Sequence, residues 1–279
     1  MLSLATPSQA FCRLTTNSIN YDPEAAVCDP DPTAIPLHWA SNHLTFAMQK
    51  DASAQVDLAL ATSAAETAFA TWEAIDCSQC ASASHTGSPS VQVDRMAPTS
   101  DNCLGFHADW VNSNTIMFRD SSWVDCDGTP QPNADSIIAL TVHTYAVNSG
   151  QIFDADIEIN TANNKVTIGS SDAAFDLQSI LTHETGHFLG LAHTQTVNNT
   201  STMFYQYVAG STNMRTPKPD DICGMCEIYP PGAAISDSQL GFFCSFRGSP
   251  GGAFFASFFA VFGAFAWRRR RHRLGRRQA

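Results

Sequence analysis

Basic residues are scarce in most of this 279-residue chain. Residues 1–246 contain only seven Lys and Arg beside all 26 Asp and Glu, which gives this part a formal net charge of −19. Proteins that bind nucleic acid release counterions through clustered Lys and Arg on their folded surface. The acidic composition therefore argues against nucleic acid as a partner.

Two other features are missing. Residues 1–10 lack the early Lys or Arg and the long apolar run of a secretion signal. We expect them to be the end of a longer signal, with export by another route as the alternative. The chain has no internal repeat and no coiled-coil heptads, and its 44% hydrophobic and 15% charged residues predict one main globular domain with appendages.

Cysteine, by contrast, is abundant, and nine cysteines favour an oxidising compartment. One of them, Cys244, belongs to the C-terminal tail. The other eight can form four disulfides, although the sequence does not choose among the pairings. These eight are Cys12, Cys28, Cys77, Cys80, Cys103, Cys126, Cys223 and Cys226. A zinc ribbon built from the two Cys-x-x-Cys pairs is the alternative, which we disfavour because a whole domain separates the pairs.

The spacing of apolar residues predicts the secondary structure. Alternation and flanking turn residues predict strands at residues 43–49, 91–96, 115–119, 137–145 and 152–159. Helical spacing predicts helices at residues 55–75, 175–191 and 219–229. The turn residues at 148–150 predict that the last two strands form a hairpin. Strands, a helix, more strands and then further helices indicate an α+β domain of roughly 200 residues.

The stretch from Leu181 to His193 contains three of the nine histidines. His183 and His187 are four residues apart, so on a helix both can donate a ring nitrogen to one Zn²⁺. Glu184 lies beside the first ligand, where it can deprotonate a water bound to the ion. Gly190 lets the chain leave the helix sharply, so that His193 can become the third ligand.

A helix with histidines that face solvent, or that are satisfied in the core, is the alternative. His-Glu-x-x-His has only three fixed positions and does not exclude it. The addition of Gly190 and His193, on a segment predicted independently to be a helix that ends at this glycine, favours the metal site strongly.

Residues further along the chain make the motif resemble that of the metzincin zinc endopeptidases. Met203 follows His193 by ten residues and stands where that family has its Met-turn. Residues 220–229 resemble the C-terminal helix signature of the matrixin branch, and the chain is similar to matrixin-like peptidases of myxobacteria. The resemblance implies a catalytic domain with a twisted mixed sheet, a long N-terminal helix, a zinc-binding active-site helix and a C-terminal helix. It also implies a zinc cofactor, Glu184 as general base, and a peptide substrate extended along the strand around residues 140–144.

The chain departs from the matrixin pattern in two places. It has no Pro-Arg-Cys-Gly motif of the kind that silences the zinc in vertebrate matrixins, and we expect Cys12 to pair with Cys28 instead. The hairpin resembles the segment that binds structural zinc and calcium, and it keeps His143. Its acidic residues favour a Ca²⁺ site over structural zinc, with a solvated acidic strand edge as the alternative. The expected calcium ligands are Asp154, Asp156 and Glu158.

Tyr205 lies two residues after Met203. Astacin-like and serralysin-like metzincins have a tyrosine at this position that can reach the metal or the developing oxyanion, whereas matrixins generally have proline. Tyr205 is therefore a candidate transition-state stabiliser. A tyrosine that only packs in the core is the alternative.

The C-terminal tail combines an apolar run with a basic cluster. Residues 251–267 carry no charge and are just long enough to span a bilayer, and four arginines follow at 268–271. With Cys244 upstream, the tail resembles a myxobacterial C-terminal sorting signal, which implies a temporary membrane anchor that is cut near this cysteine. We thus expect an N-terminal arm at 1–34, a peptidase domain at 35–235, and a spacer, membrane segment and sorting tail at 236–279.

These observations favour a secreted or cell-surface zinc endopeptidase that hydrolyses peptide bonds in extracellular proteins. A surface binding module of matrixin fold that holds zinc without cleaving peptides is the alternative. The presence of Glu184 favours the enzyme, because a decayed enzyme often loses its base.

Overall fold

The computed structural model describes residues 11–17, 28, 31–80, 86–106, 112–131, 136–169, 174–194 and 201–236. Residues 1–10, Cys244 and the tail at 251–271 lie outside the described residues, so the expectations for a secretion signal, a membrane segment and a sorting site stay predictions. Within the described ranges, no helix has the length and apolar character needed to cross a membrane.

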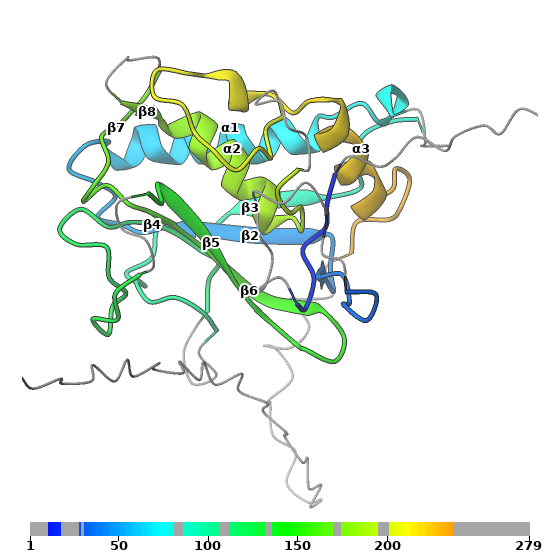
Figure 1. Cartoon of the computed structure of the whole chain (residues 1–279), viewed down its shortest axis with the longest axis horizontal. Helices are drawn as coiled ribbons and strands as arrows, with labels where there is room; N and C mark the ends of the chain where they lie inside the picture. The colour runs from blue at the N-terminus through cyan, green and yellow to red at the C-terminus, as the bar shows by residue number, and fades with distance from the viewer. Residues whose placement is uncertain are drawn as a thin grey trace, which may run out of the picture. The chain divides into compact units, whose positions relative to one another are not determined.

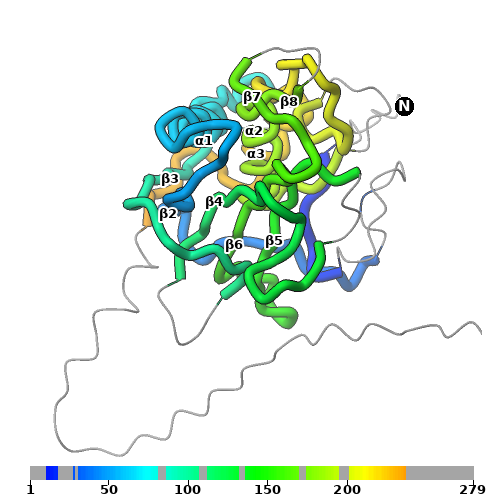
Figure 2. Tube along the Cα trace, turned by 90° about the vertical axis from the view of Figure 1, so that its left-hand side faces the viewer, coloured from blue at the N-terminus to red at the C-terminus, as the bar shows by residue number. Residues whose placement is uncertain are grey.

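A six-stranded mixed sheet forms the base of the domain. Its strands are β1 (His38–Trp39), β2 (His43–Met48), β3 (Gln92–Arg95), β4 (Thr115–Phe118), β5 (Ala139–Tyr145) and β6 (Gln151–Ile159). The order is β3-β2-β4-β6-β5, with β1 beside the start of β6, and Figure 2 shows this succession. All pairings are parallel except that of β5 with β6, so the expected hairpin and the mixed sheet are confirmed.

Two helices, α1 (Leu58–Glu73) and α2 (Leu177–Phe188), cover one face of the sheet (Figure 1). The α1 face that points inward is lined by small alanines and then by Phe69 and Trp72, all of which are buried. Small side chains let the two helices approach closely, and the Trp72 indole N–H donates a 2.9 Å hydrogen bond to the Thr182 carbonyl of α2. The core between helices and sheet therefore holds α2 in place.

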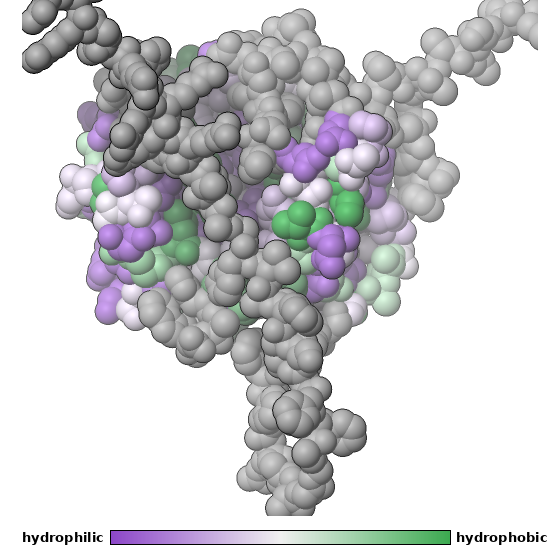
Figure 3. Space-filling model, turned by 60° about the horizontal axis from the view of Figure 1, so that its bottom comes forward, coloured by the Kyte–Doolittle hydropathy of each residue, from purple (hydrophilic) through white to green (hydrophobic). Residues whose placement is uncertain are grey.

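Alternate side chains of the strand β6 face opposite sides of the sheet. Ala155, Ile157 and Ile159 belong to the core beneath the helices. Residues 154, 156 and 158 alternate with them and so face the other side of the sheet, where Gly105 and Arg119 from the long connections contact them. Figure 3 brings that side forward, and its described surface mixes hydrophilic residues with small hydrophobic patches.

Four disulfides connect the eight cysteines of the body, which confirms the expected number. The pairs are Cys12–Cys28, Cys77–Cys226, Cys80–Cys223 and Cys103–Cys126. Two bridges tie the short 3-10 helix η2 (Cys77–Gln79) to the helix α3 (Pro219–Ile228). Because the two Cys-x-x-Cys pairs bond to each other, the zinc-ribbon alternative is wrong.

The predicted helices and strands are confirmed to within a few residues at their ends. The shortest elements were not predicted: β1, β7 (Val166–Thr167), β8 (Phe175–Asp176), η2 and η3 (Asn213–Arg215). Two or three residues are too few to show a period of apolar spacing, so the sequence carries no signal for them.

Candidate metal centre

The helix α2 has a strong start and a sharp end. Asp176 caps its N-terminus by accepting hydrogen bonds from the Ser179 backbone N–H (2.9 Å) and hydroxyl (2.8 Å). Arg215 in η3 forms a two-pronged ion pair with the same carboxylate, at 2.7 and 2.6 Å. At the other end, Gly190 has φ +106°. Its N–H bonds to the His187 carbonyl, and the Leu191 N–H bonds to that of Gly186, which together form a Schellman motif.

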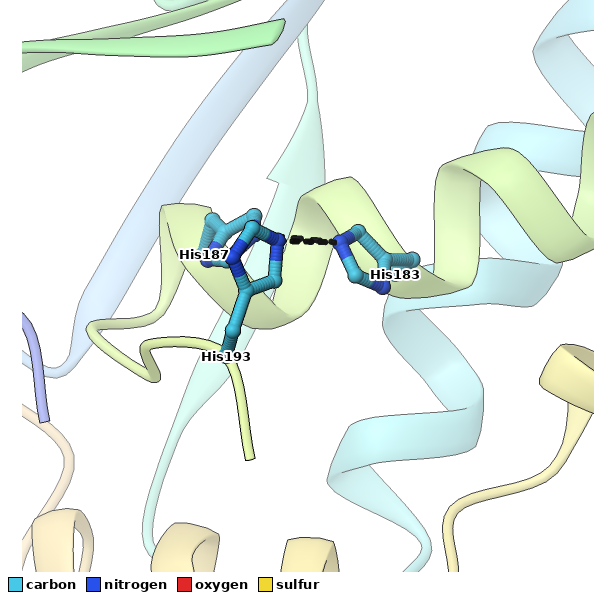
Figure 4. A group of neighbouring side chains, drawn as sticks. All are labelled: His183, His187 and His193. Carbon is cyan, nitrogen blue, oxygen red and sulfur yellow. Dashed lines mark hydrogen bonds between the residues drawn. The ribbon is translucent and has the colours of Figure 1, made fainter. Parts of the chain in front are cut away.

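This end turns the chain back, so that His193 meets the two histidines of α2 (Figure 4). The Nε2 atoms of His183, His187 and His193 lie 3.1 to 3.3 Å from one another. Zn²⁺ with imidazole nitrogens at about 2.05 Å in a tetrahedron would separate those nitrogens by roughly 3.3 Å. The three histidines thus fit a zinc ion, and within the described ranges they are the sole group of three potential metal ligands.

Hydrogen bonds and burial also favour the form of these histidines that binds a metal. The Nδ1 atoms of His183 and His187 face the carbonyl oxygens of Thr202 (2.7 Å) and Leu191 (2.8 Å), which accept hydrogen bonds when Nδ1 carries the proton. Nε2 is then left with a lone pair for a metal. Burial lowers the pKa of His183 to about 3, and it also lowers the pKa of His193. The His183 and His193 rings are therefore neutral near pH 7, as a metal ligand must be.

The Met203 turn lies against the middle of α2. A Cβ atom on Gly186 would overlap the Met203 sulfur and the Trp72 ring, so only glycine permits this approach. The buried carboxylate of Asp221 in α3 holds the turn by accepting hydrogen bonds from the backbone N–H groups of Thr202 (2.8 Å) and Met203 (3.2 Å). The turn carries the Thr202 carbonyl that orients His183, so α3 supports the metal centre indirectly.

Glu184 is buried beside His183, and a hydroxyl group donates to each of its carboxylate oxygens. The Thr141 hydroxyl of β5 lies 2.6 Å from Oε2, and the Tyr207 hydroxyl lies 2.7 Å from Oε1. The Tyr207 ring packs edge-on against the His183 ring at 5.1 Å, and burial raises the pKa of Tyr207 well above its ordinary value. The general-base candidate therefore has a defined orientation.

The sequence indicated Tyr205 as a residue of the site and gave no indication of Tyr207. The Tyr205 ring lies 6.4 Å from the His193 ring, and it also packs against Phe204 at 4.7 Å. Both tyrosines lie in the segment that follows Met203, and only the path of the chain decides which one reaches Glu184. Thr141 was not predicted either, because a single threonine in a strand carries no catalytic signature.

The three expected calcium ligands do not form one group of possible metal ligands within the described ranges, although the Asp154 and Asp156 side chains contact each other. The Glu158 carboxylate contacts the Arg119 guanidinium, while Asp156 accepts hydrogen bonds from the N–H groups of Gly105 (2.7 Å) and Thr115 (2.8 Å). Asp154 and Asp156 are each 2% exposed and Glu158 is fully buried, so the solvated-edge alternative is wrong. These carboxylates face away from α2, and the calcium site stays a prediction.

His143 of the same hairpin does not face those carboxylates. It projects to the helix side, where its Nε2 lies 3.1 Å from the His187 carbonyl. Burial lowers the pKa of His143 to about 4. His143 thus contacts α2 and lies on the opposite side of the sheet from the expected calcium ligands.

Comparisons with known proteins agree with this geometry. The sequence profile of the family described as matrixin matches residues 38–230. Among curated proteins, the chain is similar to Metalloendoproteinase 1-MMP of Arabidopsis thaliana, with 30% identity over 114 residues, or 41% of this chain and 29% of that protein. It is also similar to Metalloendoproteinase 1 of Glycine max, with 34% identity over 103 residues, or 37% of this chain and 32% of that protein. The matched stretches cover a minor part of either relative.

Proposed function

We propose that this chain, which belongs to the matrixin family, is a zinc-dependent endopeptidase and cleaves extracellular proteins. The observation that carries the proposal is the convergence of three Nε2 atoms beside the buried carboxylate of Glu184. His183, His187 and His193 would hold the ion. A bound Zn²⁺ supplies the polarisation of the scissile carbonyl and the acidity of the attacking water.

Glu184 then has the role of general base. A carboxylate beside the first ligand accepts the proton of the attacking water and passes it to the leaving amine. Its two hydroxyl donors leave each oxygen a second lone pair, because a carboxylate accepts about four hydrogen bonds. The carboxylate can therefore keep both donors while it handles the proton.

The strand β5 is the proposed peptide-binding edge. Among the described strands β5 pairs with β6 alone, so within the described ranges the other edge of residues 140–144 has no strand partner and could pair with an extended peptide. Thr141 of this strand touches Glu184, which brings a peptide paired there alongside the base. Tyr207 borders a cavity of about 100 Å³, which is lined by apolar residues such as Ile180 and by as many polar ones, and which offers room for a substrate side chain.

Secretion or display at the cell surface is part of the proposal, and four disulfides support it. The tail at 251–271 would anchor the chain in a membrane at least temporarily, with cleavage near Cys244. Mass spectrometry of the mature protein tests this, because peptides beyond residue 250 are expected to be absent after processing. Their presence would indicate a permanent anchor.

The decisive experiment compares the wild-type protein with Glu184→Ala. Chelator-sensitive cleavage of casein is expected for the wild type, while the variant should bind one zinc per chain and lose cleavage. Equal cleavage by both proteins would overturn the role of Glu184. A wild-type protein that binds zinc but cleaves neither casein nor other unfolded proteins would support the binding-module alternative instead.

A further inference from the structure

The Glu184 side chain is held between two walls of the site. Thr141 reaches it from the sheet, and Tyr207 reaches it from the segment after Met203. The two donors are 66 positions apart in the sequence, and each meets a different carboxylate oxygen. Only the folded chain brings these three residues together.

The direction of Thr141 follows from the strand register. Thr141 pairs with Ile157, a core residue beneath the helices, and paired residues on neighbouring strands point to the same face. The Thr141 side chain therefore points to α2 from the open edge of the sheet. Its hydroxyl also lies 3.1 Å from the Glu184 backbone carbonyl, but the 2.6 Å contact with the carboxylate is the shorter and is the charge-assisted one.

Tyr207 is placed differently. Its ring packs against His183 and borders the cavity that also contacts Ile180 of α2, so the ring itself has a packing role. The hydroxyl adds a separate contact, because it donates to Oε1 of Glu184 at 2.7 Å. Phenylalanine would keep the packing and remove only this hydrogen bond.

We infer that Thr141 and Tyr207 are positioning residues that clamp the Glu184 carboxylate in the orientation its proton transfers require. The inference rests on the proposed peptidase function. A carboxylate free to rotate would spend part of its time out of line with the water and the leaving amine, and small misplacements of a catalytic group lower the rate strongly. Neither hydroxyl needs to touch the substrate, so the clamp affects the chemical step and not substrate binding.

The first test measures kcat and KM for Thr141→Val, Tyr207→Phe and the double variant. Each single change is expected to lower kcat roughly 10-fold, with KM changed by less than about 2-fold. Thr141→Ser should restore kcat because it keeps the hydroxyl. Thr62→Val on α1 is the matched control, since it removes a threonine hydroxyl that bonds only to the Leu58 carbonyl.

Zinc content and melting temperature separate positioning from loss of structure. The clamp predicts wild-type zinc content and a kcat per bound zinc that still falls. Unchanged kcat in Thr141→Val and Tyr207→Phe, or an effect confined to KM, would overturn the clamp while leaving the peptidase function intact. A wild-type protein without cleavage would contradict the proposed function instead.

A second test does not depend on activity. Crystal structures of the wild type and of the Thr141→Val, Tyr207→Phe double variant would show the Glu184 side chain directly. The clamp predicts one orientation in the wild type and a shifted or multiple orientation in the variant, with the three histidines unmoved. The same single orientation in both proteins would refute it.

Discussion

Met203 packs against Gly186 in the middle of the helix that carries His183 and His187. This contact leaves no space for a side chain at residue 186. In most helices Gly→Ala stabilises the protein by about 0.5–1 kcal/mol. Here the added methyl group would push Met203 and Trp72 away from residue 186.

Gly186→Ala is therefore expected to lower the free energy of unfolding by roughly 1–3 kcal/mol, the usual cost of overpacking. Chemical denaturation measures this change. Combining it with Met203→Ala supplies the control, because the cost of Gly186→Ala should shrink once the methionine is gone. A stabilised Gly186→Ala protein would show that the contact is looser than described.

The Asp176 cap predicts how the stability of the fold depends on pH. Burial alone would raise the pKa of Asp176, but hydrogen bonds from Arg215, Ser179 and Gly169 outweigh burial and hold the pKa below 3.8. Because the folded state favours the ionised form, this stabilisation is complete above the unfolded-state pKa and is lost as the pH falls through the folded-state value.

Asp176→Asn keeps a capping side chain and removes the charge. We expect it to cost about 2 kcal/mol at pH 7. The difference between the two proteins should shrink as the pH falls below 3.8, which urea unfolding between pH 2.5 and pH 7 measures. A constant difference across that range would mean that the ion pair with Arg215 contributes nothing.

Removal of the paired bridges Cys77–Cys226 and Cys80–Cys223 should change the free energy of unfolding in a strongly non-additive way. They join the same two segments, with sequence separations of 149 and 143 residues, so either bridge alone closes the long loop. By loop entropy, replacing one bridge with two serines should cost roughly 2–3 kcal/mol, and replacing both about 7 kcal/mol. Guanidinium unfolding of the three variants measures this, and a double cost equal to the sum of the single costs would contradict the entropic explanation.

The N-terminal arm predicts an effect on metal affinity. The Leu14 N–H donates to the Gly190 carbonyl, and the Cys12 carbonyl accepts from Ala192, so the arm braces the turn that leads to His193. Replacing Cys12 and Cys28 with serine should loosen the arm and weaken zinc binding roughly 10-fold, as loss of support to a ligand does. Competition with a chromophoric chelator measures the affinity.

The matched control replaces the Cys103–Cys126 bridge, which lies in the connections on the far side of the sheet. Its removal should leave zinc affinity unchanged. Equal affinity in the Cys12/Cys28 variant and the wild type would show that the arm does not support the third ligand.

Local patterns in the sequence were enough for the elements and for the metal-binding motif. The spacing of His183 and His187 defines one helix face, and a glycine at 190 with φ +106° ends that helix where the motif requires. These features depend on residues a few positions apart, and helix geometry alone relates them. The Cys12–Cys28 bridge and the β5–β6 hairpin likewise join segments that are close in the sequence, although no helix relates them.

The tertiary structure decided what depends on distant residues. The alternation at 154, 156 and 158 shows that three carboxylates share a face of β6, but only the sheet shows that this face points away from α2 and meets Arg119. In the same way, the sequence presents two tyrosines after Met203, and only the path of the chain places Tyr207 and Thr141 on Glu184. Local periodicity tells which residues lie together on an element, whereas packing between elements determines what each face meets.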